Sequence, residues 1–376
     1  MSNLSEKEEL LILWFNNING LGNKTKNKLI EYFGNIENIY NVSDNVLNSF
    51  LESINNRLQI TKDLEKIKML REKLYEKNIY FVYPGHKKYP AKLMNIYDKP
   101  RILYVKGKIK EEINIYNKNV GIVGSRLPDI YGEEMSRVFA RDLAKNGINI
   151  VSGLAKGIDS KAHEGCLEAG GYTVAVIGCG INVVYPRENI ELYREIEKKG
   201  AIISEYCLDV QPNSGFFPQR NRIISGMSDS IFVVEARQKS GSLITVDYGL
   251  EQGKQIYALP GRVLDKNSVG TNNLIKMGAV CVTEPNDIIM DMNGQCFFDN
   301  NDMCKEKSDI NNIKEKNSLA PIEKMVYSCL SLEPMYIDEI IHKLNIDITK
   351  TISTLYILEE KKLIKQPIKG YYILAL

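Results

Sequence analysis

The sequence lacks any apolar run that approaches the roughly 20 residues needed for a membrane-spanning helix. Residues 1–9 are charged rather than apolar, so we expect neither an export signal nor a membrane span. Seven cysteines are present, but no two form a C-x-x-C pair, which argues against a zinc site and against a disulfide framework. These absences favour a protein of the reducing cytoplasm.

An excess of charge of either sign is also missing. Lys and Arg total 49 against 47 Asp and Glu, which gives a formal net charge of +2. Residues 1–65 are slightly acidic, with 9 acidic and 6 basic side chains, and residues 319–376 are balanced. Bulk electrostatics therefore cannot identify a partner, and any nucleic-acid binding has to come from a local cluster.

What the sequence does contain is four loops rich in glycine or arginine, three of which follow short apolar runs. The strand-loop-helix order places the unpaired N–H groups of a helix's first turn beside such a loop, where they favour an anion. Glycine lets the backbone approach a ligand closely. The pattern predicts phosphate binding by the loops Gly121–Arg126, Ser152–Asp159, Arg220–Ile224 and Ser240–Thr245.

Residues 116–292 show the alternation of strands and helices that is typical of a Rossmann-like α/β core. Such alternation implies a parallel sheet with right-handed crossovers, whose ligands bind beyond the carboxyl ends of the strands. Strands are expected at Asn119–Val123, Ile148–Val151, Thr173–Ile177, Ala201–Ser204, Ile231–Val234, Gln255–Ala258 and Val280–Thr283. Helices are expected at Gly132–Asn146, Asp159–Ala169 and Glu188–Lys199.

A helical module and a connecting subdomain are expected before this core. Residues 1–65 show helical periodicity around the hairpin Ile18–Thr25, which resembles the helix-hairpin-helix or SAM-like modules of DNA-handling proteins. Its acidic balance favours a structural or protein-contact role, and direct DNA contact stays open. Residues 66–115 form the connecting subdomain of the Rossmann-like region, with a helix at Lys66–Lys77 and short strands at Ile79–Val82 and Ile102–Val105.

After the core, residues 293–318 are polar and lack a sustained apolar period, so we expect a flexible linker. Residues 319–376 show three helical patterns followed by two short strands, which predicts a winged helix. Because this unit carries a balanced charge, protein contact is favoured over DNA reading.

The core lacks the G-x-G-x-x-G motif of dinucleotide-binding proteins. The first loop reads G-x-x-G-S-R, and Gly178-Cys179-Gly180 is followed by Val183 where a third glycine belongs. NAD or FAD binding is therefore not expected, and no cofactor is predicted.

Eight segments occur in a fixed order: Gly121–Arg126, Val151–His163, Ala175–Pro186, Ser204–Tyr206, Phe217–Gly226, Val234–Thr245, Leu259–Gly261 and Gly270–Ala279. Together they resemble the ordered signature of the DNA-processing protein A (DprA/Smf) family. The flanking modules match the family's layout, so the resemblance covers essentially the whole chain. It implies a cytoplasmic homodimer, not an enzyme, that binds and protects single-stranded DNA and loads the RecA recombinase in natural transformation and homologous recombination.

These residues predict a clamp for single-stranded DNA that works without catalysis. Arg126, Arg220 and Arg222 would contact successive phosphates, and the Phe217 ring would stack on an unpaired base. No catalytic or metal-binding residue is predicted. The predicted DNA-binding residues are Gly124, Ser125, Arg126, Gly153, Lys156, Gly157, Phe217, Arg220, Asn221, Arg222, Lys239, Ser240 and Gly241.

The sequence leaves alternatives open for several of these residues. Arg220 or Arg222 could pair with Glu205 or Glu235 inside the fold. Phe217 could belong to the core, and the glycines could serve turn geometry alone.

Three further positions, Asp159, His163 and Ser214, lie in or near the predicted site. His163 is expected to pack rather than to catalyse, and Asp159 to cap its helix. Family members described as DNA binders often carry a lysine six residues before the first arginine of the R-N-R motif, where this chain has Ser214. The hypothesis that follows is a weaker affinity for single strands.

Two other functions compete with DNA binding. Similar sheets occur in nucleotide phosphoribohydrolases, whose Pro-Gly-Gly-x-Gly-Thr loop is followed by a catalytic glutamate. Residues 239–247 have too few glycines for that loop, and Asp247 is their only acid. An adaptor whose sheet binds a small nucleotide or nothing is the other alternative, and it predicts that neutralising Arg126 leaves DNA binding intact.

Overall fold

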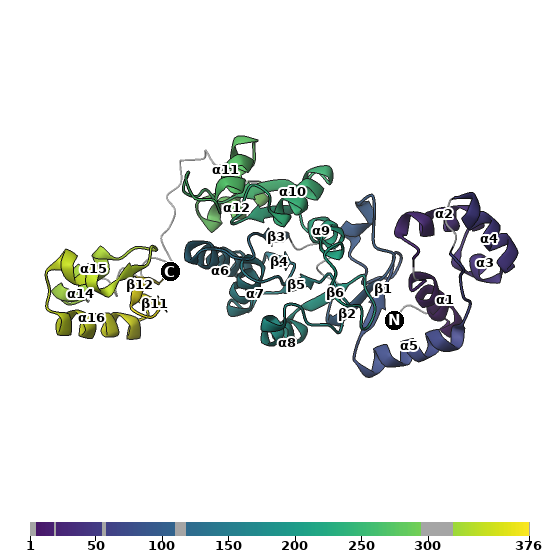
Figure 1. Ribbon diagram of the computed structural model, residues 1–376, viewed down its shortest axis with the longest axis horizontal. Helices are drawn as coiled ribbons and strands as arrows, with labels where there is room; N and C mark the ends of the chain where they lie inside the picture. Colours follow the sequence, from purple (N-terminus) through teal and green to yellow (C-terminus); the bar gives the residue numbers. More distant parts are fainter. Residues whose placement is uncertain (1–4, 19, 55–57, 110–117, 295–318, 376) are drawn as a thin grey trace.

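The computed structural model describes residues 5–18, 20–54, 58–109, 118–294 and 319–375. Figure 1 shows a helical module at one end, a large sheet covered by helices in the middle, and a small α/β unit at the other end. The linker expected at residues 293–318 lies almost entirely outside the described residues.

The central sheet has nine strands in the order β1-β2-β6-β5-β4-β3-β7-β8-β9. The seven strands from β6 to β9 in that order are parallel, and β1 and β2 add antiparallel to the β6 edge. Strand order therefore reverses between β3 and β7. The strands are β1 (Tyr80–Val82), β2 (Leu103–Gly107), β3 (Asn119–Val123), β4 (Asn149–Ser152), β5 (Thr173–Val176), β6 (Ala201–Ser204), β7 (Ser230–Val233), β8 (Gln255–Ala258) and β9 (Val280–Cys281).

Helices cover both faces of this sheet, because the parallel strands are apolar on both sides. One face packs against α6 (Ile130–Lys145), α7 (Ile158–Glu168), α8 (Ile190–Lys199) and α12 (Pro285–Met292). The other face packs against α9 (Phe216–Met227), α10 (Gly241–Glu251) and α11 (Val269–Lys276). Two short 3₁₀ helices, η1 (Ala91–Asn95) and η3 (Arg187–Asn189), complete the unit.

The N-terminal module consists of α1 (Glu6–Asn16), α2 (Asn23–Phe33), α3 (Ile36–Asn41) and α4 (Asp44–Ser53), followed by α5 (Leu64–Glu76). Its apolar core surrounds Trp14, whose indole N–H donates to the Thr61 carbonyl at 2.8 Å. Side-chain hydrogen bonds tie the module to the sheet: Asn17 donates to the Tyr104 hydroxyl at 2.7 Å, and Asn23 donates to Glu205 at 3.2 Å. The hairpin between α1 and α2 therefore faces the central unit.

The C-terminal unit has its own apolar core, built from three helices and a three-stranded antiparallel sheet in the order β10-β12-β11. The three helices and the two strands after them are the elements that the sequence predicts for a winged helix, whereas β10, between the first and second helices, was not predicted; the assignment of the unit to that fold stays a prediction. Its elements are α14 (Pro321–Cys329), β10 (Met335–Tyr336), α15 (Ile337–Leu344), α16 (Ile348–Glu360), β11 (Ile364–Ile368) and β12 (Tyr371–Leu374).

The structure corrects one local prediction that matters for function. Residues 220–224 were expected to form a loop, but they lie inside helix α9. Pro218 does not prevent this helix, because it occupies the first turn, where the N–H group that proline lacks has no partner within the helix. Side chains two residues apart in a helix are related by a rotation of about 200° around the helix axis. Arg220 and Arg222 therefore point to nearly opposite sides of α9 and have different surroundings.

Candidate functional site

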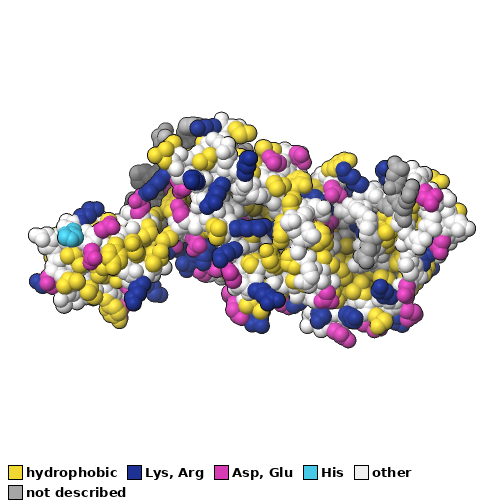
Figure 2. All heavy atoms as spheres, in the orientation of Figure 1, with side chains coloured by type: hydrophobic (Ala, Val, Ile, Leu, Met, Phe, Trp, Pro, Cys, Tyr) yellow, Lys and Arg dark blue, Asp and Glu magenta, His cyan; other side chains and the backbone are white. Residues whose placement is uncertain are grey.

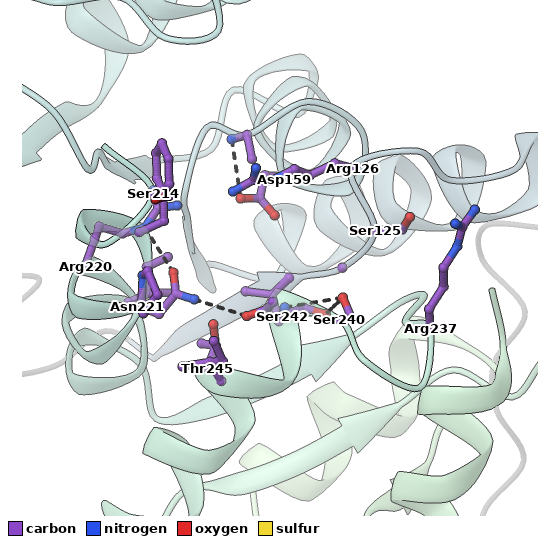
Figure 3. Close-up of a pocket in the computed structure, with 18 of the residues that line it drawn as sticks. Ser125, Arg126, Asp159, Ser214, Arg220, Asn221, Arg237, Ser240, Ser242 and Thr245 are labelled. Carbon is purple, nitrogen blue, oxygen red and sulfur yellow. Dashed lines mark hydrogen bonds between the residues drawn. The ribbon is translucent and has the colours of Figure 1, made fainter. Parts of the chain in front are cut away.

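A cavity of about 720 Å³ lies at the point where strand order reverses. We call it the switch-point cavity; it is lined by the loops after β3 and β7, by α9 and by the start of α10. Figure 3 shows Arg220 and Asn221 on one side of it, Ser125 and Arg237 on another, and Ser240 near the start of α10. Such switch points are where open α/β sheets bind ligands.

The loop after β3 places an exposed arginine over an aromatic ring. The Arg126 guanidinium lies 5.1 Å from the centroid of the Phe217 ring, within cation–π distance. Tyr185 also stacks on the Phe217 ring, with the two ring centroids 5.6 Å apart and the ring planes inclined by 26°. Among the described residues Arg126 has no carboxylate partner, so its charge is available to an anion in the cavity.

Arg220 is buried in the wall of the same cavity. Its Nη1 donates to the carbonyls of Gly153 and Val176 near the ends of β4 and β5, and its Nε donates to Asn221 at 3.1 Å. Burial lowers the pKa of Arg220 to about 10, and the Asp159 carboxylate opposes that shift. Arg220 thus keeps a positive charge behind the cavity surface.

Helix α10 begins at the floor of the cavity. Ser240 is its N-cap and accepts from the Ser242 N–H at 3.3 Å, while Gly241 has open space where a side chain would stand. A ligand can approach the backbone of Gly241 closely, next to the positive end of the helix dipole. Lys239 and Arg237 are exposed on the loop that leads into this helix.

A side cavity of about 210 Å³ adjoins the first and shares Arg126, Phe217 and Arg220 with it. Gly153 and Lys156 line this side cavity, and Lys156 pairs with Glu188 at 3.1 Å. A side chain at Gly153 would meet the Arg220 guanidinium at 2.6 Å, so the glycine makes room for that arginine.

Gly157 lines neither cavity. It has a φ of +84°, and a side chain there would meet the Ser125 carbonyl at 2.6 Å. Turn geometry and close packing against the first loop therefore explain this glycine, as the alternative interpretation held.

Arg222 is the predicted site residue that the structure moves away from the cavity. Its Nη2 donates to Glu205 at 2.8 Å and its Nε donates to Asp98 at 3.1 Å, and its side chain is 6% exposed. The idea of three arginines along one phosphate track is corrected to Arg126 and Arg220 at the cavity, with Arg222 as an internal ion-pair partner. The helical geometry of α9 is the reason.

Several lining residues are missing from the predicted DNA-binding residues. Tyr185 and Arg237 lie outside the four predicted phosphate loops, whereas Ser242 and Thr245 lie inside the predicted loop Ser240–Thr245 but were not named individually. A signal existed for Arg237, which stands between a predicted strand and a predicted phosphate loop. Tyr185 meets Phe217 only through the tertiary fold, which no local pattern encodes.

Asp159 and His163 have structural surroundings. Asp159 accepts from the N–H groups of Gly153 and Ala155 at 3.1 and 3.4 Å, so it fixes the preceding loop rather than capping its own helix.

His163 Nδ1 lies 2.7 Å from the Thr173 hydroxyl, and burial together with Arg220 lowers its pKa to about 3. A neutral packing histidine results. Within the described residues, no group of three His, Cys, Asp or Glu side chains could hold a metal ion.

Glu235 follows β7 and lies behind the first loop. Its ionisation predicts that the stability of the fold depends on pH. Burial raises its pKa from 4.5 to about 7, although the Asp129 N–H donates to it at 3.1 Å. The unfolded chain therefore ionises first as pH rises, and this group's contribution to stability is lost between about pH 4.5 and pH 7. Glu235→Gln should escape that loss, so its melting temperature should gain on the wild type between about pH 5 and pH 8.

Differential scanning fluorimetry across that pH range measures the effect. Glu251→Gln, which replaces an exposed carboxylate on α10, is the matched control and should follow the wild-type curve. Parallel curves for Glu235→Gln and wild type would show that Glu235 ionises alike in both states.

The fold and the cavity together define a Rossmann-like protein with a cationic pocket at the switch point of its sheet. The family model described as DNA recombination-mediator protein A matches residues 80–293. Protein Smf of Escherichia coli is 42% identical over 217 residues, which cover 57% of this chain and 57% of that protein. DNA processing protein DprA of Bacillus subtilis is 38% identical over 217 residues, covering 58% and 72%. The chain belongs to the DNA recombination-mediator protein A family.

Solved structures agree with this membership. The X-ray structure of DNA processing protein A from Streptococcus pneumoniae matches with a TM-score of 0.61 and 32% identity, covering 74% of this chain and 96% of that one. The Helicobacter pylori protein, solved to describe its single-stranded DNA binding mode, matches with a TM-score of 0.52 and 30% identity over 57% and 96%. The sequence match spans just over half of the length of the Escherichia coli relative.

Proposed function

We propose that this chain binds single-stranded DNA in the switch-point cavity and acts without catalysis. The observation that carries the proposal is the cluster of Arg126, Arg220 and the Tyr185–Phe217 stack at one cavity. Cations attract the phosphates, and the aromatic stack offers a surface to unpaired bases of any sequence. In a duplex the bases are already stacked on one another, so they are not free to stack on Tyr185 or Phe217.

Charge distribution supports a local contact rather than a broad basic face. Figure 2 shows Lys and Arg side chains interspersed with Asp and Glu over the visible face of the molecule. At the cavity the balance differs, because Arg126, Arg220, Arg237 and Lys239 face a single lining carboxylate, Asp159. The cavity is therefore the part of the surface where a bound polyanion has the most favourable electrostatic interaction.

Enzymatic hydrolysis of nucleotides finds little support in this geometry. Asp159 is the carboxylate among the described lining residues, and its oxygens already accept two backbone N–H groups. Asp247, the acid of the α10 region, does not line the cavity. A general acid or base for the phosphoribohydrolase reaction is thus missing from the described lining residues.

The wider role follows from the family resemblance and belongs to the same proposal. A homodimer would join two cavities along one strand and raise avidity through effective concentration. The strand held in this way would be handed to the RecA recombinase during natural transformation and recombination, in the cytoplasm. No helix among the described residues is long and apolar enough to cross a membrane.

Fluorescence anisotropy with labelled oligo-dT of about 20 nucleotides tests the function, using unlabelled duplex as competitor over a salt series. We expect saturable binding that resists the duplex and weakens with salt. Absence of binding to the single strand would overturn the proposal, and equal competition by the duplex would reduce it to general polyanion binding.

A further inference from the structure

A second cavity, of about 690 Å³, lies between the N-terminal module and the central unit. We call it the hairpin cavity, because the α1–α2 hairpin forms one of its walls and the loop after β6 forms another. The third wall is α9, the helix that also lines the switch-point cavity.

Helix α9 divides its side chains between the two cavities at helical spacing. Phe217, Arg220 and Asn221 line the switch-point cavity, whereas Phe216 and Gln219 line the hairpin cavity. The two cavities therefore lie on either side of the first turns of one helix, whose diameter with side chains is about 10–12 Å. A chain molecule that leaves one cavity over the start of α9 reaches the other.

Each phenylalanine at this helix start carries a stacked tyrosine. Tyr206 stacks on Phe216 with ring centroids 4.2 Å apart and planes inclined by 28°, much as Tyr185 stacks on Phe217 at 5.6 Å and 26°. Tyr206 lines the hairpin cavity and Tyr185 the switch-point cavity. The aromatic surface offered to a base is thus present twice, once on each side of the helix.

The hairpin cavity also carries positive charge that the protein does not neutralise. Its two carboxylates, Asp98 and Glu205, are both engaged by Arg222. Lys24, Lys26 and Arg101 also line it, and none of the three has a carboxylate at ion-pair distance in the described part of the chain.

Lys26 is buried, and its ammonium group donates to the Asn16 carbonyl at 2.7 Å. Burial lowers its pKa to about 8. The Glu205 carboxylate opposes that shift without forming an ion pair with Lys26, so an anion that enters the cavity would stabilise this buried cation further.

The backbone of the hairpin adds donors on the same side. Helix α2 starts at Asn23 without a side-chain cap, and its first turn holds no acidic residue. Gly22, the residue before it, has open space where a side chain would stand. An anion can therefore approach these N–H groups directly, beside the lysines of the same turn.

From these observations, and resting on the proposed single-strand function, we propose that the hairpin cavity is a second subsite for the same strand. The strand would pass from the switch-point cavity over the Phe216-Phe217 pair, stack a base on Tyr206 and place a phosphate near Lys24, Lys26 and Arg101. The N-terminal module thereby contributes to DNA binding, although its overall charge is acidic.

Two lengths of oligo-dT distinguish binding at one subsite from binding at both. The short strand has about 6 nucleotides and the longer one about 20. Anisotropy is measured for wild type, Lys24→Glu and Tyr206→Ala, with melting temperatures recorded to confirm folding. The matched control is Lys68→Glu, which makes the same charge change at an exposed position of α5, the helix that follows the N-terminal module.

We expect all four proteins to bind the short strand alike. For the longer strand, Lys24→Glu and Tyr206→Ala should each lose about tenfold in affinity, and Lys24→Glu should also show a smaller salt dependence. Lys68→Glu should keep the wild-type values.

The outcomes keep the two proposals apart. Failure of wild type to bind either strand would sink the proposed function itself. Short-strand binding together with an undiminished long-strand affinity in Lys24→Glu and Tyr206→Ala would refute the second subsite and attribute any gain with length to bridging between two protomers. Excess thymidine monophosphate could also abolish the higher affinity of the longer strand while the short strand stays bound. That result would assign the hairpin cavity to a free nucleotide instead.

Discussion

Arg126→Ala is expected to lower the affinity for a short oligo-dT by about 10- to 100-fold while leaving the melting temperature unchanged. The arginine is exposed, contacts the Phe217 ring and has no carboxylate partner among the described residues, so the fold loses little without it. A bound strand, in contrast, loses a charge-assisted hydrogen bond to phosphate. The slope of log affinity against log salt should fall by about one.

The control for this prediction removes an arginine elsewhere on the same unit. Arg194 on α8 is exposed, pairs with Glu191 at 2.7 Å and lines none of the three cavities described above. Arg194→Ala should bind as the wild type does. An Arg126→Ala protein that also binds like wild type would favour the adaptor alternative, in which the cavity is not the DNA site.

Much of the sheet could be predicted because its strands are encoded locally. Runs such as Asn119–Val123 and Ala201–Ser204 are continuous, apolar and bounded by polar or glycine residues, and both became strands with those bounds. The order of the strands follows from βαβ handedness only in part. The antiparallel addition of β1 and β2 next to β6 depends on contacts between distant segments, which local patterns do not reveal.

The candidate site was predictable in its loops and not in its helix. Glycine, serine and arginine after a strand are recognisable because the local backbone determines where they lie, and Ser125, Arg126 and Ser240 do line the cavity. The direction of Arg220 and Arg222 depends on whether α9 exists and where it starts. Residues 220–224 were interpreted as a loop, so the sequence left open an internal ion pair with Glu205 but did not reveal which of the two arginines forms it.

Arg222→Gln tests that divergence, because the two interpretations of this arginine predict different losses. The structure places the guanidinium, 6% exposed, between Glu205 and Asp98, whose side chains are 15% and 36% exposed. Removing one partner of a buried ion pair leaves its carboxylates uncompensated, at a cost of about 3–5 kcal/mol. We therefore expect a melting temperature lower by on the order of 10 °C, and short-strand affinity close to wild type below the transition.

A second substitution shows whether the uncompensated charge is the cause of that loss. Adding Glu205→Gln to Arg222→Gln removes one of the two carboxylates that Arg222 engages, so the double variant should melt above the single one. An Arg222→Gln protein with unchanged melting temperature and strongly reduced affinity for the short strand would reverse the assignment. It would return Arg222 to the phosphate track of the switch-point cavity, and α9 would then have to present both arginines to one ligand. Since residues two apart on a helix point about 200° away from each other, that outcome requires the start of α9 to unwind when DNA binds.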